Sequence, residues 1–385
     1  MTDVVIAGIG QTVVGEHWEI GLRELAYAAL QDAVRDSGGL KPQSLFVGNM
    51  LAPTLSNQAH VGALLVDYAG LTGIEAVTIE AAGASGGAAL RQGYLAVASG
   101  MVDVALVVGV EKFTDKVGAG VEEALATASD SDFEAVQGMT QTAQAALLMK
   151  RYMHEHQVPA NGFAGFALTA HANGAANKNA MFRKAIKPDT YSKAEMVSDP
   201  LNMFDMAPNA DGAAALVLTR RELLPSNFTN PLVKISGSAA SSDTLALHDR
   251  KDMLFFDTSQ ISAGKAMKQA GVVLDDIDLF EYHDVFSIYA ALQLEAVGFA
   301  VRGQGWKLAE DGETSKKGKI PCATMGGMKA RGFPGGAAGV YQAAEAVTQL
   351  RGQAEANQIT NARTALIQSL GGPASTAVSH ILQVL

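Results

Sequence analysis

Residues 79–113 read IEAAGASGGAALRQGYLAVASGMVDVALVVGVEKF, and this stretch decides the fold class. A turn rich in glycine and alanine comes first, a helical segment follows it, and an apolar run rich in valine comes last. This order predicts a turn, a helix and a buried strand of an α/β protein. A turn that enters a helix is a good place to present a nucleophile, but Gly83 and Ala84 have no reactive side chain and Ser85 offers only a hydroxyl.

The same order of elements recurs near the end of the chain. Residues 335–372 again contain a Gly-rich turn, a helical segment and an apolar strand, offset from the first copy by roughly 250 residues. Residues 4–48 and 232–286 match each other in the same way, as strand, helix, turn and strand. We therefore predict a duplicated α/β fold, with mostly parallel sheets that helices cover on both sides.

The segment between the two copies has a different character. Residues 115–225 contain polar, loop-rich runs and separate helical stretches, which is typical of an inserted lid or ligand-binding segment. The predicted domains are an N-terminal half at 1–230, which carries this loop domain at about 115–225, and a C-terminal half at 231–385.

Composition narrows the class of protein. The chain has 385 residues, 48% of them hydrophobic, and a net charge of −10, which argues against broad nucleic-acid binding. Its single cysteine suits a reducing compartment. The sequence contains no run of about 18 apolar residues, so no membrane span is predicted. The chain opens on the strand-like DVVIAGIG without a signal-peptide pattern, so we expect a cytoplasmic protein.

Five separated motifs, in order along essentially the whole chain, resemble those of the thiolase superfamily, with the archaeal and sterol-carrier-protein-type acyl-CoA thiolases as the best match. They are DVALVVGVEKF, DGAAALVLT, EYHDVF, GGMKARGFPGGAAG and QSLGGPASTAVSHIL. The resemblance implies a five-layered αβαβα thiolase fold with two pseudo-symmetric halves and an inserted loop domain. It also implies coenzyme A thioesters as substrates or ligands, acetyl-CoA C-acetyltransfer by Claisen condensation or thiolysis, and no metal or redox cofactor.

The resemblance also assigns site positions, and two of them depart from the family pattern. Gly83 stands where the family has its nucleophilic cysteine, and Phe333 stands where it has the histidine that activates the thiol. His283 matches the histidine of one oxyanion hole, and Gly371 and Gly372 match the loop whose amides line the other. Without thiolate and imidazole, we expect thiolytic activity to be weak or lost.

Other side chains offer no clear substitute nucleophile. The positions where relatives carry a second cysteine hold Ser369 and Val285, and Cys322 matches neither and is interpreted as a small buried residue. Ser85 is a candidate substrate contact, although Ser85 and Ser369 also fit turn or helix-capping roles.

Three functions stay open on the sequence. The first is an acyl-CoA-binding protein without turnover, which could act beside an active homologue. The second is a non-covalent acyl-CoA aldolase or lyase that uses the remaining oxyanion holes. The third is an active acetyl-CoA acetyltransferase. Tyr282 should point to the face of its strand opposite His283, which weighs against a tyrosine-dependent lyase, and Asp284 is expected to brace the turn.

The remaining expectations concern ligands and partners. Arg183, Lys184 and Lys187 could meet the coenzyme A phosphates, although they also fit an ordinary solvated surface. The resemblance implies a homodimer or a dimer of dimers, paired through an edge strand near the Gly83 turn. It further implies a possible small partner protein with a zinc ribbon and an OB fold; any zinc would belong to that partner, because the chain shows no Cys/His cluster.

Overall fold

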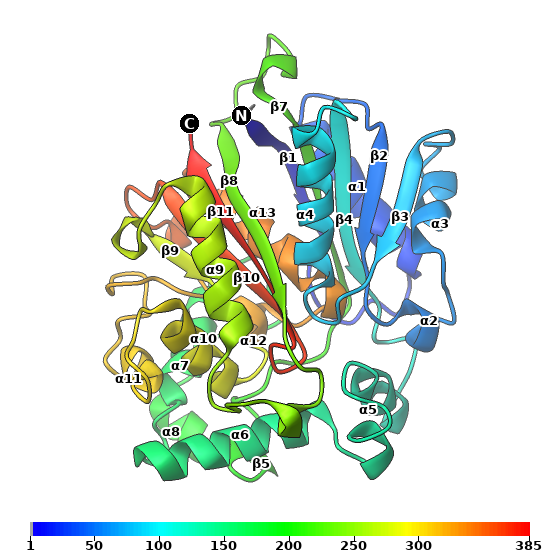
Figure 1. Ribbon diagram of the computed structural model, residues 1–385. Helices are drawn as coiled ribbons and strands as arrows, with labels where there is room; N and C mark the ends of the chain where they lie inside the picture. The colour runs from blue at the N-terminus through cyan, green and yellow to red at the C-terminus, as the bar shows by residue number, and fades with distance from the viewer. Residues whose placement is uncertain (1–2) are drawn as a thin grey trace.

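The computed structural model describes residues 3–385, and its centre is a mixed sheet of nine strands in the order β3-β2-β4-β7-β1-β8-β11-β10-β9 (Figure 1). The N-terminal half supplies the first five strands of this order and the C-terminal half the last four. The two half-sheets meet where Val5 and Ile6 pair with Lys234 and Val233. The strands are β1 (Val4–Gln11), β2 (Ser44–Gly48), β3 (Glu75–Ile79), β4 (Val104–Glu111), β7 (Gly212–Arg220), β8 (Val233–Ser242), β9 (Leu279–Glu281), β10 (Thr364–Gly371) and β11 (Thr376–Val384).

The two half-sheets have the same internal order. Outward from the junction, the N-terminal half runs β1, β7, β4, β2, β3, and the C-terminal half runs β8, β11, β10, β9. In the position that corresponds to β3, the second half has an isolated β-bridge between Phe280 and Cys322 instead of a strand. This correspondence agrees with the predicted pseudo-symmetric halves.

Helices form the other three of five layers. α1 and α3 cover the outer face of the N-terminal half-sheet, and α9 and α10 lie on the outer side of the C-terminal one. α4 and α13 lie between the half-sheets and touch strands of both (Figure 1). The helices of the two halves are α1 (Leu22–Asp36), α2 (Ala52–Leu55), α3 (Val61–Tyr68), α4 (Ser85–Ala98), α9 (Asp257–Ala270), α10 (Ser287–Val297), α11 (Gly305–Glu310), α12 (Gly327–Arg331) and α13 (Ala338–Leu350).

The glycines of the opening stretch let the two central helices approach each other closely. A Cβ added at Gly86 would lie 2.8 Å from the carbonyl oxygen of Gly336, and one added at Gly339 would lie 2.3 Å from the amide nitrogen of Gly87. Such distances leave no room for any side chain. The Gly-rich turns before α4 and α13 are therefore required by packing, whatever chemistry the site performs.

The expectation of mostly parallel sheets is wrong. β2 pairs in parallel with β3 and β4, and β9 with β10, but the other five pairings are antiparallel. β10 and β11 are joined by only four residues, too few for a parallel crossover. β7 follows the long insertion, which leaves the sheet at the end of β4, so the chain re-enters from that end and β7 runs antiparallel to β4.

The insertion packs at one end of the molecule, the lower end in Figure 1. It contains α5 (Ala119–Ala126), α6 (Gln141–His156), α7 (Ala164–Gly174), α8 (Pro188–Ser192) and the short pair β5 (Met196–Ser198) and β6 (Leu201–Asn202). Its chain returns to the sheet in β7, so that strand belongs to the half-sheet. Among residues 3–385, no helix combines the length and the apolar composition that crossing a membrane requires.

Candidate functional site

The site begins with the tight turn between β3 and α4. Ala82 has a φ of +49°, in the left-handed region that residues with a Cβ rarely adopt. The Ser85 hydroxyl braces the turn, since it accepts the Ala81 N–H at 2.9 Å and donates to the Ala82 carbonyl at 2.6 Å. Ser85 is fully buried, and its hydroxyl serves the turn rather than facing a ligand.

Gly83 follows at the inner end of this turn and lies directly against His283. A Cβ added at Gly83 would be 2.7 Å from the Leu370 carbonyl oxygen and 3.0 and 3.2 Å from Cε1 and Nε2 of His283. The structure therefore brings Gly83 and His283 together, as the motif alignment expected. The backbone of β10 lies so close to Gly83 that a side chain there would require a shift of the Leu370 carbonyl.

His283 follows β9 and is held through its backbone. Gln293 on α10 accepts its N–H at 3.0 Å and donates to its carbonyl at 2.8 Å. Burial, and secondarily the positive charge of Arg331, lowers the pKa of His283 to about 3. The imidazole is therefore neutral near pH 7, able to donate one hydrogen bond but not to act as a charged acid.

Phe333 occupies the other side of His283. Its ring packs edge-on to the imidazole, with centroids 5.7 Å apart, and lies 6.5 Å from the ring of Phe113. Its backbone is fixed on both sides, because its N–H donates to Pro208 and its carbonyl accepts from Ala210. With only 3% of its surface exposed, Phe333 makes this wall of the site apolar.

The end of β10 forms a third wall. A Cβ added at Gly371 would lie 2.7 Å from the Ala81 carbonyl, so Gly371 also touches the turn before α4. Gly372 follows with a φ of +55°. Near this wall, Ser369 donates its hydroxyl to Gln342, and Val285 is buried in the core, so neither side chain is free to act as a nucleophile.

The basic residues of the insertion lie at a separate cavity. Lys184 and Lys187 line a space of about 840 Å³, together with His171, Phe204 and the buried Lys329. Arg183 is exposed and is not part of this wall, and neither are Gly83, His283 and Phe333. The cavity does reach Pro208, whose carbonyl accepts the backbone N–H of Phe333. The segment that contains Pro208 therefore separates this cavity from the site at Gly83.

Sequence reasoning missed a set of buried charges that hold the site together. Glu111, at the end of β4, accepts hydrogen bonds from Asn49, Met50, Leu51 and Gly336, and burial raises its pKa to about 7. It therefore ties the turn before α13 to β2 and β4. Lys329 donates to the Asp205 carbonyl at 2.7 Å, and burial lowers its pKa to about 8. Their signal in the sequence is a charged residue inside an apolar or Gly-rich run.

The neighbours of His283 in the sequence have structural contacts. The Asp284 carboxylate accepts the Met328 N–H at 2.7 Å, which fits the predicted bracing of a turn. Tyr282 packs against Phe166 and Phe280, away from the ring that His283 contacts. Cys322 is fully buried in the main core, and burial raises the pKa of its thiol well above the ordinary value.

Taken together, the side chains at Gly83 offer a neutral hydrogen-bond donor and an apolar wall, and no nucleophile. Within the described part of the chain, no group of three or more His, Cys, Asp or Glu side chains converges as a metal site would require. The arrangement can orient a carbonyl or stabilise a developing oxyanion. It has no group at Gly83 that could form a covalent acyl intermediate.

Comparison with known proteins identifies the class to which this fold and site belong. Residues 4–222 match the thiolase N-terminal domain, and residues 239–384 match the thiolase C-terminal domain-like family. The chain therefore belongs to the thiolase family, as the motifs predicted, and has the thiolase fold.

Particular relatives refine this placement. The chain is 40% identical over 383 residues to an acetyl-CoA acetyltransferase of Methanothermobacter thermautotrophicus, with 99% of each chain covered. It is 27% identical to sterol carrier protein 2 of Gallus gallus, over 96% of this chain and 69% of that protein. The structure of the Ltp2-ChsH2(DUF35) aldolase superimposes with a TM-score of 0.86 at 22% identity, over 99% of this chain and 98% of the other.

Proposed function

We propose that this thiolase-family protein binds acyl-CoA thioesters without forming a covalent acyl-enzyme. The observation that carries the proposal is the closed space at Gly83, where a Cβ would lie 2.7 Å from the Leu370 carbonyl. The ping-pong acyl transfer of the family needs a thiolate there and an imidazole to activate it. Neither Gly83 nor Phe333 can supply these groups, and removal of one cooperating group already costs several powers of ten in rate.

His283 would orient the thioester in this proposal. Its neutral imidazole can donate a hydrogen bond to a carbonyl oxygen in a dry environment, where such a bond is strong. The backbone amides of Gly371 and Gly372 would contribute a second group of donors, because their loop lies against the same turn.

Lys184 and Lys187 would hold the phosphates of coenzyme A. Their side chains are exposed at the edge of the 840 Å³ cavity, whose wall is largely apolar. Lysines attract phosphate as point charges, and the apolar wall suits the remainder of the ligand. Arg183 could add to this field from the surface, although it does not line the cavity.

Isothermal titration calorimetry with acetyl-CoA and with free CoA tests the proposal. We expect saturable binding that weakens about three- to tenfold in a Lys184→Gln/Lys187→Gln variant. Lys317→Gln/Lys319→Gln, which removes two exposed lysines that do not line the cavity, is the matched control and should bind as the wild type does. Absence of heat and of thermal stabilisation with both ligands would refute acyl-CoA binding.

A second candidate is a non-covalent acyl-CoA aldolase or lyase. It is favoured by the fold similarity to the Ltp2-ChsH2(DUF35) aldolase and by the neutral donor at His283, which could stabilise an enolate without a nucleophile. Cleavage of β-hydroxyacyl-CoA substrates without added CoA would support it.

An active acetyl-CoA acetyltransferase is the third alternative, favoured by the 40% identity to an enzyme of that name. Thiolysis of acetoacetyl-CoA by the wild-type chain would establish that activity.

The assembly is also a proposal. β3 is an edge strand with exposed Glu75, Val77 and Thr78, and such an edge favours pairing with a second copy. We propose a homodimer through this edge.

A small partner protein with a zinc ribbon and an OB fold is a further proposal. It is supported by the DUF35 component in the name of the structural neighbour.

A cytoplasmic location is proposed from the single, unpaired cysteine.

A further inference from the structure

The strands β9 and β10 stop pairing just before they reach the candidate site. They run parallel, and their last paired residues are Glu281 and Ile367. His283 follows β9 and Gly371 ends β10, so both of these walls of the site lie beyond the last pair. Ligands of open α/β sheets bind beyond the carboxyl ends of parallel strands. The groups that fix the two chain segments beyond this pair therefore fix the geometry of the site.

The carboxamide of Gln342, on α13, joins the two segments where the pairing ends. Its Nε2 donates to the carbonyls of Glu281, Tyr282 and Gln368 at 3.0, 2.8 and 3.0 Å. Its Oε1 accepts the hydroxyl of Ser369 at 2.9 Å. The side chain is 2% exposed, so a single buried carboxamide bridges the ends of both strands.

These bonds lie next to the two groups that close the space at Gly83. His283, whose ring would lie 3.0 Å from a Cβ at Gly83, directly follows a residue whose carbonyl Gln342 binds. Leu370, whose carbonyl oxygen would lie 2.7 Å from that Cβ, is two residues beyond another. Gln342 therefore holds the backbone of each wall within two residues of its contact with the Gly83 turn.

The bond to Ser369 reaches the contact between the two central helices. A Cβ added at Gly339 of α13 would lie 2.6 Å from the Ser369 hydroxyl oxygen, and one added at Gly87 of α4 would lie 2.9 Å from it. This hydroxyl therefore lies where α4 and α13 approach each other. Since the Gly83 turn leads directly into α4, Gln342 is also connected to the helix that begins at the site.

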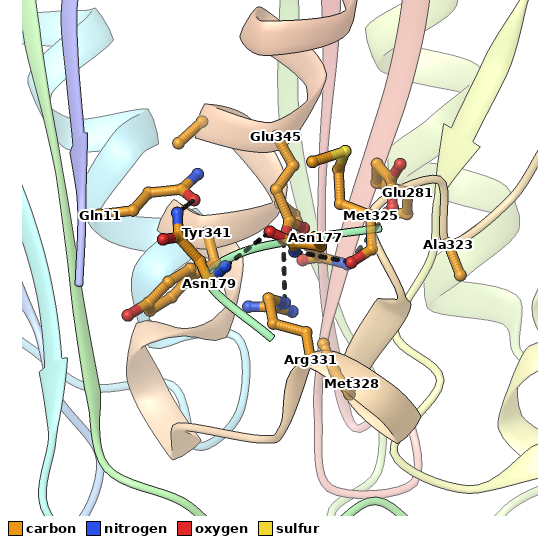
Figure 2. Close-up of polar contacts among 12 residues, drawn as sticks. Gln11, Asn177, Asn179, Glu281, Ala323, Met325, Met328, Arg331, Tyr341 and Glu345 are labelled. Atoms are coloured by element: carbon orange, nitrogen blue, oxygen red, sulfur yellow. Dashed lines mark hydrogen bonds and ion pairs between the residues drawn. The ribbon is translucent and has the colours of Figure 1, made fainter. Parts of the chain in front are cut away.

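Other contacts hold α13 itself in place. Figure 2 shows the Arg331 guanidinium below the Glu345 carboxylate, with Tyr341 of the same helix beside them. Nε of Arg331 lies 3.2 Å from Oε1 of Glu345, although neither atom finds a hydrogen-bond partner within residues 3–385. The guanidinium carbon lies 4.8 Å from the centroid of the Tyr341 ring, and all three side chains are buried. The Gln342 carboxamide is therefore attached to a fixed backbone.

We propose that Gln342 is a positioning residue of the candidate site, a role that rests on the proposed binding of acyl-CoA. It sets the separation of the His283 and Gly371 walls, and with it the alignment of a thioester carbonyl bound between them. Gln342 does not itself bind the ligand, because its two amide hydrogens already serve three carbonyls and its oxygen accepts from Ser369. Loss of the carboxamide removes the link between the two segments, and small displacements of binding groups weaken an oriented contact strongly.

Isothermal titration of the full chain with acetyl-CoA and with free CoA tests this role. We expect the wild type to bind acetyl-CoA more tightly than CoA, because acetyl-CoA adds a thioester carbonyl to which His283 can donate. Gln342→Met keeps the length of the side chain and removes the carboxamide. It should lower the preference for acetyl-CoA about three- to tenfold and leave the affinity for CoA unchanged.

Gln349→Met is the matched control. Gln349 lies two turns further along α13, is 1% exposed, donates to the Asn357 carbonyl at 2.8 Å and accepts the Ile359 N–H at 2.9 Å. These partners lie outside the candidate site. Both variants should lose similar stability in urea unfolding, but only Gln342→Met should change the preference for acetyl-CoA. A merely structural role of Gln342 predicts the same ligand preference in both variants.

A measurement on the ligand-free chain separates this role from the proposed function. The imidazole resonances of His283, assigned in a histidine-labelled chain by their loss in His283→Gln, should shift in Gln342→Met and stay unchanged in Gln349→Met. If the wild type binds neither ligand, the proposed function fails, and these spectra still decide whether Gln342 positions His283. Unchanged resonances in Gln342→Met, or a preference for acetyl-CoA that this variant leaves intact, would overturn the inference.

Discussion

The closed space at Gly83 predicts that introducing the two side chains that the thiolase motifs would have at positions 83 and 333 will not produce thiolysis. The perturbation is the double variant Gly83→Cys/Phe333→His. If only the catalytic pair had been lost, this variant would regain a thiolate and its activating imidazole. The structure leads us to expect that it folds less stably and is inactive, because the surrounding backbone leaves no room for a side chain at position 83.

The magnitude follows from the contact at Gly83. The new Cβ would lie 2.7 Å from the Leu370 carbonyl oxygen, about 0.6 Å inside a normal carbon–oxygen approach of about 3.3 Å. Leu370 belongs to β10, which pairs with β9 and β11, so its carbonyl cannot rotate away as a side chain could. Overpacking of this kind costs about 1–3 kcal/mol. A histidine at position 333 adds about 1–3 kcal/mol if its ring nitrogens stay unpartnered.

The assays separate packing from chemistry. Urea unfolding gives the free energy of unfolding, and Gly83→Ala is the matched control because it adds the same Cβ without a thiol. We expect Gly83→Ala and Gly83→Cys to lose similar stability. Thiolysis is followed with acetoacetyl-CoA and CoA, and intact-mass measurement detects any acyl-enzyme. A double variant that keeps wild-type stability and gains at least about tenfold in thiolysis would refute the reasoning.

Three further predictions concern packing, charge and assembly. Phe333→Ala should destabilise the chain by about 3–5 kcal/mol in urea unfolding, because Phe333 is buried between Phe113 and His283; a loss below about 1 kcal/mol would show that the wall collapses freely. Asp211→Asn should cost about 1.5–3 kcal/mol at neutral pH, since it removes the nearer of the two carboxylates that face the buried Lys112, at 3.1 Å, and leaves Asp115 at 3.5 Å. Burial opposes ionisation of Asp211, but hydrogen bonds from Thr114, His17 and Lys112 outweigh it and lower its pKa, so its contribution is present above the unfolded-state pKa and disappears as the pH falls through the folded value; unfolding measured against pH should lose that part of its acid dependence in Asp211→Asn. Val77→Lys, on the exposed edge of β3, should shift sedimentation from dimer toward monomer, and an unchanged sedimentation profile would argue against pairing through β3.

The sequence predicted a duplicated α/β fold because its signals are local and repeated, and the resemblance of five motifs to thiolases implied the particular fold. The Gly-rich turn, helix and apolar strand of residues 79–113 recur at 335–372, and both copies form the expected elements. Gly271 ends α9 with a φ of +69°, a left-handed conformation that glycine adopts readily. Strand direction was harder to predict, because apolar runs look alike in parallel and antiparallel neighbours. The direction of β11 follows from its four-residue link to β10, and the direction of β7 follows from the end of the sheet at which the insertion returns.

The candidate site, like the fold, was only partly predictable from the sequence. Motif positions named Gly83, His283, Phe333 and Gly371 in advance, and the tertiary structure places them around one turn. The sequence could not reveal that the Leu370 carbonyl would crowd Gly83, because that contact joins segments far apart in the chain. Nor could it show that Arg331 and Glu345 form a buried pair without good hydrogen bonds, or that Lys184 faces a separate cavity. Residue identity is set by the sequence, but burial, charge state and free volume depend on which segments meet, and only the tertiary structure decided those.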